Sequence, residues 1–417
     1  MNNYKYHAFS GFGIELEYMI VNQDTLHVAA IADKILGEAE DMDVPRGDAA
    51  WSNELALHVI ETKTAGPIAD LHHAAGIFRR EVNAINELLT EYNARLMPTG
   101  MHPWMDPFSE TKLWPNQNSE IYSTFDRIFD CRGHGWSNLQ SMHINFPFAS
   151  EEEFAKLHAA VRLVLPLLPA IAASSPFWNA ARAPHLDQRL AVYQTNCLKV
   201  PQVTGQVIPE AVFSYHDYQQ LLQSIYRGIA PYDPESILQE EWLNARGAIA
   251  RFDRGAIEIR VLDTQECPEH DLSIAFFTTE LVRAIYEGKL GNLSEAMAYS
   301  TEDLARQFHG CVKQGLACAI DAPYSRALCS DAKTARELFL DLMARLVPMQ
   351  SPHRVALELI LSEGNLAQRL VQTLAQTLDK STQEPSPRQV RGVLEPMYRE
   401  LCECLSSGRA YLPRVLA

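Results

Sequence analysis

The chain has 417 residues, of which 47% are hydrophobic, so it has enough apolar side chains for a large buried core. Its 36 basic and 52 acidic residues give a formal net charge of −16, which argues against a general affinity for nucleic acid or for an anionic membrane surface. Because the sequence has no run of eighteen apolar residues, no signal-peptide pattern at its N-terminus and no paired Cys-x-x-Cys units, we expect a cytoplasmic protein whose eight cysteines are free thiols.

A predicted strand near the N-terminus carries two carboxylates. In residues 11–20, apolar side chains alternate with Glu15 and Glu17, which is the period of a β-strand. The two carboxylates therefore point the same way, and they repel each other unless a cation lies between them. A divalent cation would stabilise the pair. This stretch alone leaves open the alternative of an exposed strand face with two solvated acids.

Two further acids lie in the next predicted strand. After a short helix at 31–40, residues 48–64 are typical of a long strand and carry Glu54 and Glu61. Because these acids are seven residues apart, a regular strand would place them on opposite faces. We therefore expect a bulge or a sharp twist between Asn53 and Glu61 that brings both carboxylates to one site.

The following segments alternate helix, strand and loop. Residues 68–96 have the apolar stripe of an amphipathic helix, and residues 96–103 are typical of a third strand. The loop after them runs through Asn118, and its length makes it a candidate substrate lid. A short helix is expected at 120–129.

The strand expected at 136–148 presents His143 and Asn145 on one face, because they are two residues apart. A satisfied core histidine is the alternative interpretation of His143. We expect His58 and His102 to be structural rather than metal ligands.

The C-terminal side of this strand is predicted to be mostly helical, with one hairpin. Ser150 begins a helix with the pattern of a capping box, and Pro166 and Pro169 are expected to kink or end it. Residues 179–232 are mixed, and Arg182 and Arg189 in this segment are weak candidates for binding a substrate carboxylate. Further helices are expected near residues 215–226, 270–288, 301–318, 333–347, 352–378 and 387–406.

Residues 248–264 are typical of a β-hairpin with its turn at 253–255. This hairpin places Arg251 before the turn and brings Glu258 and Arg260 onto one face after it. The chain as a whole is expected to contain an α+β catalytic core at 1–290, with a helical C-terminal region at 291–417 packed on it as part of one domain.

Several of these stretches, in this order and at this rough spacing, resemble the glutamate–cysteine ligase family, in particular its bacterial carboxylate–amine ligase branch. The stretches are Gly-Ile-Glu-Leu-Glu-Tyr, Glu-Leu-Ala-Leu-His-Val-Ile-Glu-Thr-Lys-Thr, Met-His-Ile-Asn, Leu-Leu-Pro-Ala-Ile-Ala-Ala-Ser-Ser-Pro-Phe-Trp and Arg-Phe-Asp-Arg-Gly-Ala-Ile-Glu-Ile-Arg-Val-Leu-Asp. The resemblance implies a glutamine-synthetase-like fold, in which a curved antiparallel sheet lines an active-site funnel and helices cover its outer face. It also implies ATP-dependent joining of the γ-carboxylate of glutamate to an amine, such as cysteine, through an acyl phosphate.

The resemblance also implies roles for single residues. Arg260 would contact the transferring phosphate and act with Glu258, while Asn145 and Arg251 would lie near the nucleotide. The implied ligands of two or three magnesium ions, with manganese as an alternative metal, are Glu15, Glu17, Glu54, Glu61, His143 and Glu258. Asn145 departs from the family, which usually has a second histidine there, and this departure concerns the substrates more than the chemistry.

The residues themselves support such chemistry independently of the family resemblance. Crowding a carboxylate against a triphosphate requires several positive charges, which divalent cations held by oxygen ligands and an arginine fork supply. No Walker-type loop is present in the sequence. The expected partners are glutamate and an amine, without nucleic acid or membrane, and a homo-oligomer is compatible with the sequence. A phosphotransferase of the guanidino-kinase type and a non-catalytic nucleotide- or amino-acid-binding relative remain as alternatives.

Overall fold

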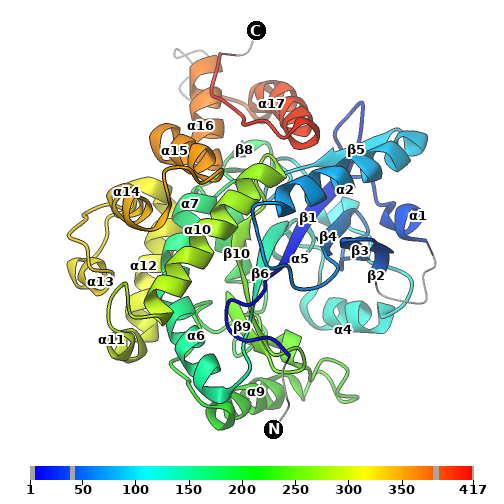
Figure 1. Cartoon of the computed structure of the whole chain (residues 1–417). Helices are drawn as coiled ribbons and strands as arrows, with labels where there is room; N and C mark the ends of the chain where they lie inside the picture. The colour runs from blue at the N-terminus through cyan, green and yellow to red at the C-terminus, as the bar shows by residue number, and fades with distance from the viewer. Residues whose placement is uncertain (1–4, 38–42, 379–384, 416–417) are drawn as a thin grey trace.

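The computed structural model describes residues 5–37, 43–378 and 385–415. Within them, one eight-stranded sheet has the strand order β2-β3-β4-β1-β6-β10-β9, and β5 also pairs with β1 (Figure 1). Every pairing in this sheet is antiparallel. The strands are β1 (Gly13–Asn22), β2 (Asp43–Arg46), β3 (Ala49–Asn53), β4 (Val59–Thr64), β5 (Ala94–Met97), β6 (Ser141–Pro147), β9 (Ala248–Arg251) and β10 (Ala256–Asp263). The short strands β7 (Phe177–Trp178) and β8 (Ala181–Arg182) pair separately.

The two faces of the sheet differ in chemistry. In β1, Ile14, Leu16, Tyr18 and Ile20 are fully buried, because they face the helical layer that contains α2 and α10 (Figure 1). The alternate side chains of β1 face the other side, as the two-residue period of a strand requires. The expected antiparallel sheet with helices on one face and acids on the other is confirmed.

The predicted strand at 48–64 is wrong as a single element. The chain instead reverses between β3 and β4, which pair as antiparallel neighbours with Ser52 opposite Glu61. Residues 54–58 make the reversal, and Ala56 bridges to Leu113 of the loop that was expected to be a lid. A run of alternating apolar residues cannot by itself distinguish one long strand from two short ones joined by a tight connection.

The helices before β6 differ from the prediction mainly at their ends. The helix expected at 31–40 is α1, Ala32–Leu36, and the last three residues of that prediction fall outside the described residues. The strand expected at 136–148 begins only at Ser141, after a turn of helix. The elements of this part are α2 (Ala74–Leu89), η1 (Thr90–Tyr92), α3 (Pro107–Glu110), α4 (Ser119–Phe129) and α5 (His134–Ser137).

The prolines after β6 mark an interruption in a long buried helix. α6 (Glu151–Val164) passes through the 3-10 turn η2 (Leu165–Leu167) into α7 (Leu168–Ala172), so the expected kink is confirmed. Ser150 caps α6 by accepting from the N–H of Glu153 at 3.2 Å. The segment Glu151–Ala172 is long and apolar enough to cross a membrane, but 89% of its apolar 18-residue window is buried inside the protein, as in a core helix.

The remaining elements are helical apart from the hairpin β9–β10. The helix expected at 352–378 is two helices, because the chain turns at Gly364 with φ +111°. These elements are α8 (Gln188–Tyr193), α9 (Tyr215–Ile229), η3 (Glu241–Leu243), α10 (Pro268–Tyr286), α11 (Leu293–Ala298), α12 (Thr301–Gln314), η4 (Gly315–Ala317), α13 (Ala322–Ala327), α14 (Ala335–Leu346), α15 (Arg354–Glu363), α16 (Leu366–Thr377) and α17 (Pro387–Ser407).

The C-terminal helices contact the sheet region through both apolar and charged groups. Core residues of α12, α14 and α15 belong to the same hydrophobic cluster as those of β1. Arg369 of α16 donates to Glu266, which follows β10, at 2.6 Å, and both side chains are completely buried. The division of the chain at residue 290 stays a prediction.

Candidate active site

A cavity of about 410 Å³ lies on the polar face of the sheet, and we call it the catalytic pocket. The two arginines expected at the active site, Arg251 and Arg260, line this pocket. All six residues expected to bind metal line it as well: Glu15, Glu17, Glu54, Glu61, His143 and Glu258. Residues spread from position 15 to position 260 of the sequence therefore converge on one cavity.

The strand register explains how the acids meet. Glu15 on β1 lies opposite His143 on β6 and Lys63 on β4. Glu17, two residues further along β1, lies opposite Glu61. Side chains directly opposite each other on one face have Cβ atoms only about 5 Å apart, so the register fixes a compact cluster.

Glu54 and Glu61, which one regular strand would place on opposite faces, are brought to one side by the chain reversal rather than by the expected bulge. Glu61 belongs to β4, whereas Glu54 belongs to the connection that precedes it. The alternation of faces along a single strand therefore does not apply to this pair. Carboxylate oxygens of Glu17, Glu54 and Glu61 lie within 4.8 Å of one another. Both acids reach the catalytic pocket, as expected, although by a different route.

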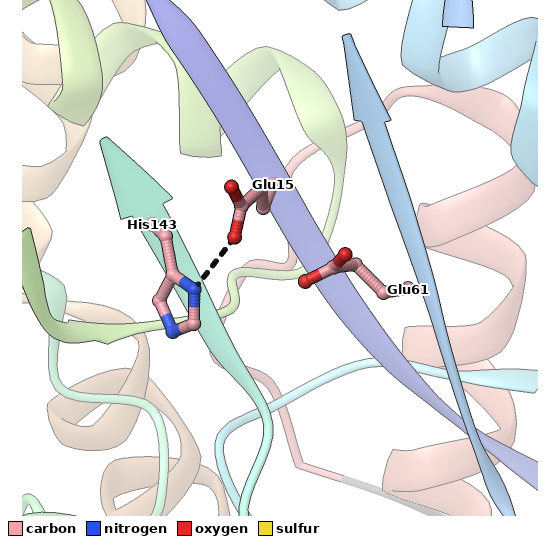
Figure 2. Close-up of side chains that lie close together, drawn as sticks. All are labelled: Glu15, Glu61 and His143. Atoms are coloured by element: carbon pink, nitrogen blue, oxygen red, sulfur yellow. Dashed lines mark hydrogen bonds and ion pairs between the residues drawn. The ribbon is translucent and has the colours of Figure 1, made fainter. Parts of the chain in front are cut away.

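A second group joins Glu15, Glu61 and His143, whose ligand atoms also lie within 4.8 Å of one another. Figure 2 shows their side chains pointing toward one another from three neighbouring strands. The ring Nδ1 of His143 lies 3.0 Å from a carboxylate oxygen of Glu15 (Figure 2), and its Nε2 lies 2.9 Å from the hydroxyl of Ser141. Both ring nitrogens of His143 therefore have partners without a metal.

Charges in this cluster are unbalanced. Burial, and then the charges of Glu17 and Glu61, raise the pKa of Glu54 well above its ordinary value. Burial and the charge of Glu15 raise the pKa of Glu61 to about 7. Burial alone would lower the pKa of His143, but its hydrogen bond to Glu15 and the neighbouring carboxylates raise it to about 9. At Glu15 burial alone would raise the pKa, but the same hydrogen bond, together with the charges of His143, Lys63 and Arg254, lowers it to about 2.

The donor set fits divalent cations. Carboxylate oxygens outnumber imidazole nitrogens in both groups, and oxygen-rich sites suit Mg²⁺ or Mn²⁺. The raised pKa values of Glu54 and Glu61 come first from burial and then from neighbouring carboxylates. Cations bound between these acids would stabilise their charged forms.

Glu258 and Arg260 form an ion pair in the catalytic pocket. The Nε of Arg260 donates to Glu258 at 2.6 Å, while Arg251 lies 3.7 Å from the other carboxylate oxygen. The register of β10 against β6 shifts between Ile259 and Leu262, so the irregularity falls at Arg260. Glu258 lies 3.6 Å from Nδ1 of His143 but belongs to neither of the two groups of close ligand atoms found among the described residues.

Comparisons with known proteins identify the family of this chain. The sequence profile described as glutamate-cysteine ligase family 2 matches residues 11–400. The chain belongs to this family. An uncharacterized protein of Archaeoglobus fulgidus is 33% identical to it over 310 residues, which cover 72% of this chain and 83% of that protein. A protein of Bradyrhizobium diazoefficiens, provisionally named glutamate–cysteine ligase 2, is 28% identical over 66% of this chain and 59% of its own length.

One solved structure is similar over nearly the whole chain: the crystal structure of the complex between the prokaryotic ubiquitin-like protein Pup and its ligase PafA. The identity is 12%, the TM-score is 0.39, and the match covers 96% of this chain and 65% of that chain. This similarity is too low to bear on function.

Two residues that the glutamate–cysteine ligase resemblance placed near the nucleotide lie in different places. Arg251 lines the catalytic pocket, whereas Asn145 lines a neighbouring cavity of about 430 Å³. Asn145 also donates to Glu15 at 2.9 Å. Glu15 lines both cavities, together with Lys63 and Arg254, so these residues form the boundary between them.

The other candidate residues lie at the pocket, on the surface or in the core. Arg189 is buried at the pocket and pairs with Asp263, whereas Arg182 on β8 is exposed. His58 and His102 are fully buried and do not line the catalytic pocket. Burial lowers the pKa of His58 to about 4 and that of His102 to about 3, so both are neutral side chains of the interior.

The sequence interpretation missed several residues that line the catalytic pocket. Lys63 lies two positions after Glu61 on the same strand face, a spacing that could have indicated it. Its ammonium lies 3.4 Å from Glu61 and 2.6 Å from Asp43. The aromatic residues opposite the acids carried no comparable signal: Tyr122, Phe125, Trp136, Tyr193 and Trp242.

Proposed function

We propose that the protein is an ATP-dependent carboxylate–amine ligase that joins the γ-carboxylate of glutamate to an amine through an acyl phosphate. The observation that carries this proposal is the convergence of five acids, one histidine and Arg260 on one cavity of a rigid sheet. Family membership supports the class of reaction. The substrates and the intermediate go beyond what family membership says.

The proposed reaction has two displacements. An oxygen of the acid attacks the γ-phosphorus of ATP, the bond to the β-phosphate oxygen breaks, and ADP leaves. The amine nitrogen then attacks the carbonyl carbon of the acyl phosphate, a C–N bond forms, the C–O bond to phosphate breaks, and the nitrogen releases a proton. Both steps concentrate negative charge at the transferring phosphoryl group.

The residues of the catalytic pocket have distinct tasks in this scheme. Glu15, Glu61 and His143 would hold one cation and Glu17, Glu54 and Glu61 a second, and such cations neutralise the phosphates when bound. Arg260 presents a planar cation to the phosphoryl group, and Glu258 fixes the orientation of that cation through its hydrogen bond. Because the strands are paired on both sides, they can hold these groups at the distances that in-line transfer needs.

Isotope transfer tests this scheme. If glutamate labelled with ¹⁸O in its γ-carboxylate is consumed with ATP and an amine, one ¹⁸O atom should appear in the released phosphate for each amide formed. A phosphorylated product without free phosphate would indicate the guanidino-kinase alternative. Free phosphate without label would refute the acyl phosphate.

Nucleotide binding should depend on divalent metal. Removing Mg²⁺ leaves the carboxylates of the catalytic pocket facing the triphosphate, so we expect the affinity for ATP to fall about tenfold or more. Calorimetric titration of ATP with Mg²⁺ and with EDTA measures the difference. Equal affinities under the two conditions would argue against the metal site.

Replacing Glu54 with glutamine should stabilise the metal-free protein. The pKa of Glu54 is raised, so its charged form opposes folding above the ordinary pKa of 4.5, and a neutral amide removes that cost of about 1 kcal/mol or more. The stabilisation by Mg²⁺ should fall in the same variant. Thermal melts with EDTA and with Mg²⁺ measure both effects, and Glu358→Gln on the surface of α15 is the control. A less stable variant with an undiminished response to Mg²⁺ would contradict the assignment.

A further inference from the structure

The catalytic pocket has two chemically different halves. The sheet supplies the acids and Arg260, whereas α4, α5 and η3 supply aromatic side chains. The ring centroids of Phe125 and Trp136 are 5.2 Å apart, and those of Phe125 and Trp242 are 5.9 Å apart. Phe125 contacts both indole rings, and we call these three rings the aromatic wall.

A hydrogen bond and a stacking contact hold the Trp136 ring of the aromatic wall in place. The indole N–H of Trp136 donates to the carbonyl of Asn196 at 3.1 Å. Phe129, which does not line the pocket, stacks on Trp136 with a centroid distance of 5.3 Å. All three rings of the wall are only half-buried although they lie in a cavity, so parts of their surfaces remain open to a ligand. Fixed, open rings are suited to pack against another ring or an alkyl chain.

The elements that form the aromatic wall supply none of the cations found among the described residues of the pocket. Among the described residues that line it, every lysine and arginine belongs to the sheet, to its hairpin turn or to α8, and none belongs to α4, α5 or η3. Each of these cations also has an acidic partner within 4.0 Å. These cations are Lys63, Arg189, Arg251, Arg254 and Arg260.

Basic residues that do belong to the neighbouring segments are directed elsewhere. Arg127 of α4 donates to the carbonyl of Tyr232 at 2.9 Å, and Lys199 donates to the carbonyl of Ile128 at 2.9 Å. A carboxylate placed against the aromatic wall would therefore lose its water without gaining an ion pair. That loss is costly, whereas an uncharged apolar group gains from the same contact.

We propose that the amine substrate is an arylalkyl primary amine without a carboxylate, whose ring packs on the aromatic wall while its nitrogen faces the acids. This inference rests on the proposed function and names the class of amine for it. Cysteine and other α-amino acids fit less well, because α4, α5 and η3 offer their carboxylate no cation among the described residues that line the pocket. The acids of the sheet attract the ammonium form of the amine before it loses its proton.

Matched amines test the inference. Phenethylamine and phenylalanine have the same ring and amino group and differ by one carboxylate, and cysteamine and cysteine form a second such pair. With ATP, Mg²⁺ and glutamate, we expect kcat/KM for phenethylamine to exceed that for phenylalanine and that for cysteine by about 100-fold or more. Equal or better use of cysteine would overturn the proposal.

Direct binding separates this inference from the ligase reaction itself. Quenching of tryptophan fluorescence, or calorimetry, with phenethylamine and with phenylalanine needs no turnover. Tighter binding of phenethylamine supports the proposal even if no amide forms, in which case the proposed function fails instead. Equal binding, or no binding of phenethylamine, overturns it.

Variants of Trp136 locate the contact. Trp136→Ala should weaken phenethylamine binding about tenfold, and Trp136→Phe, which keeps a ring, should restore most of it. The affinity for MgATP should remain within about twofold in both variants. A larger effect on MgATP than on the amine would mean that the wall holds the nucleotide base, and would overturn the proposal. If Trp136→Ala does not fold, the comparison of phenethylamine with phenylalanine on the unmodified protein decides.

Discussion

Replacing Arg260 with lysine is expected to lower turnover by about 100-fold or more while leaving the fold and metal-dependent ATP binding nearly intact. The guanidinium of Arg260 uses Nε to donate to Glu258 at 2.6 Å, which leaves its other nitrogens to meet a phosphoryl group. Lysine keeps the charge but has one nitrogen, so it cannot hold Glu258 and a phosphoryl oxygen in the same planar geometry.

Measuring ADP release, ATP affinity and thermal stability on this variant distinguishes a catalytic arginine from a structural ion pair. Arg254→Lys is the matched control, because Arg254 lines the same pocket but is exposed and lies 3.8 Å from its partner Asp253. The control should keep turnover within a few-fold of the unmodified protein. Near-normal turnover of Arg260→Lys would remove Arg260 from the catalytic residues.

A second large effect is expected on stability, at the buried ion pair between Glu266 and Arg369. Both side chains are completely buried, and Arg369 also donates to the carbonyl of Tyr411. Glu266→Gln leaves the guanidinium without its counter-charge in the interior. The free energy of unfolding should fall by about 3–5 kcal/mol. Chemical denaturation measures the change.

The pH dependence of stability checks the same pair. Burial alone would raise the pKa of Glu266, but the charges of Arg369 and His270 lower it well below the ordinary value of 4.5. An acid with a lowered pKa in the folded state stabilises the protein above pH 4.5, and this contribution is lost as the pH falls below that value. Glu266→Gln should lack this part of the acid sensitivity.

The control for this pair is Glu358→Gln, which breaks the exposed pair of Glu358 with Arg354 one helical turn away. That change should cost no more than about 0.5 kcal/mol. If Glu266→Gln were as mild as the control, the buried pair would not connect the C-terminal helices to the sheet as we infer.

Local patterns in the sequence predicted the parts of the fold that depend on one strand at a time. The alternation around Glu15 and Glu17 gave the correct faces of β1, and the turn at 253–255 gave the hairpin that carries Glu258 and Arg260. These patterns are reliable because a two-residue period and a tight turn are set by neighbouring residues.

Features that depend on distant contacts were missed or placed incorrectly. The reversal between β3 and β4 is held partly by backbone hydrogen bonds of Leu57 and Trp114. These bonds join the reversal to the loop that was expected to be a lid, and no local sequence pattern contains that contact. The aromatic wall is assembled from three elements whose rings look like ordinary core residues in sequence. Their position opposite the acids becomes visible only when the chain is folded.

The most direct test of the account is ADP release measured with ATP, Mg²⁺, glutamate and phenethylamine, each omitted in turn, with the product identified by mass. We predict ADP, free phosphate and γ-glutamyl amide in equal amounts, and only when both glutamate and the amine are present. ADP accompanied by a phosphorylated substrate, or ATP binding without any ADP release across a broad panel of acids and amines, would contradict the assignment of the protein as a carboxylate–amine ligase.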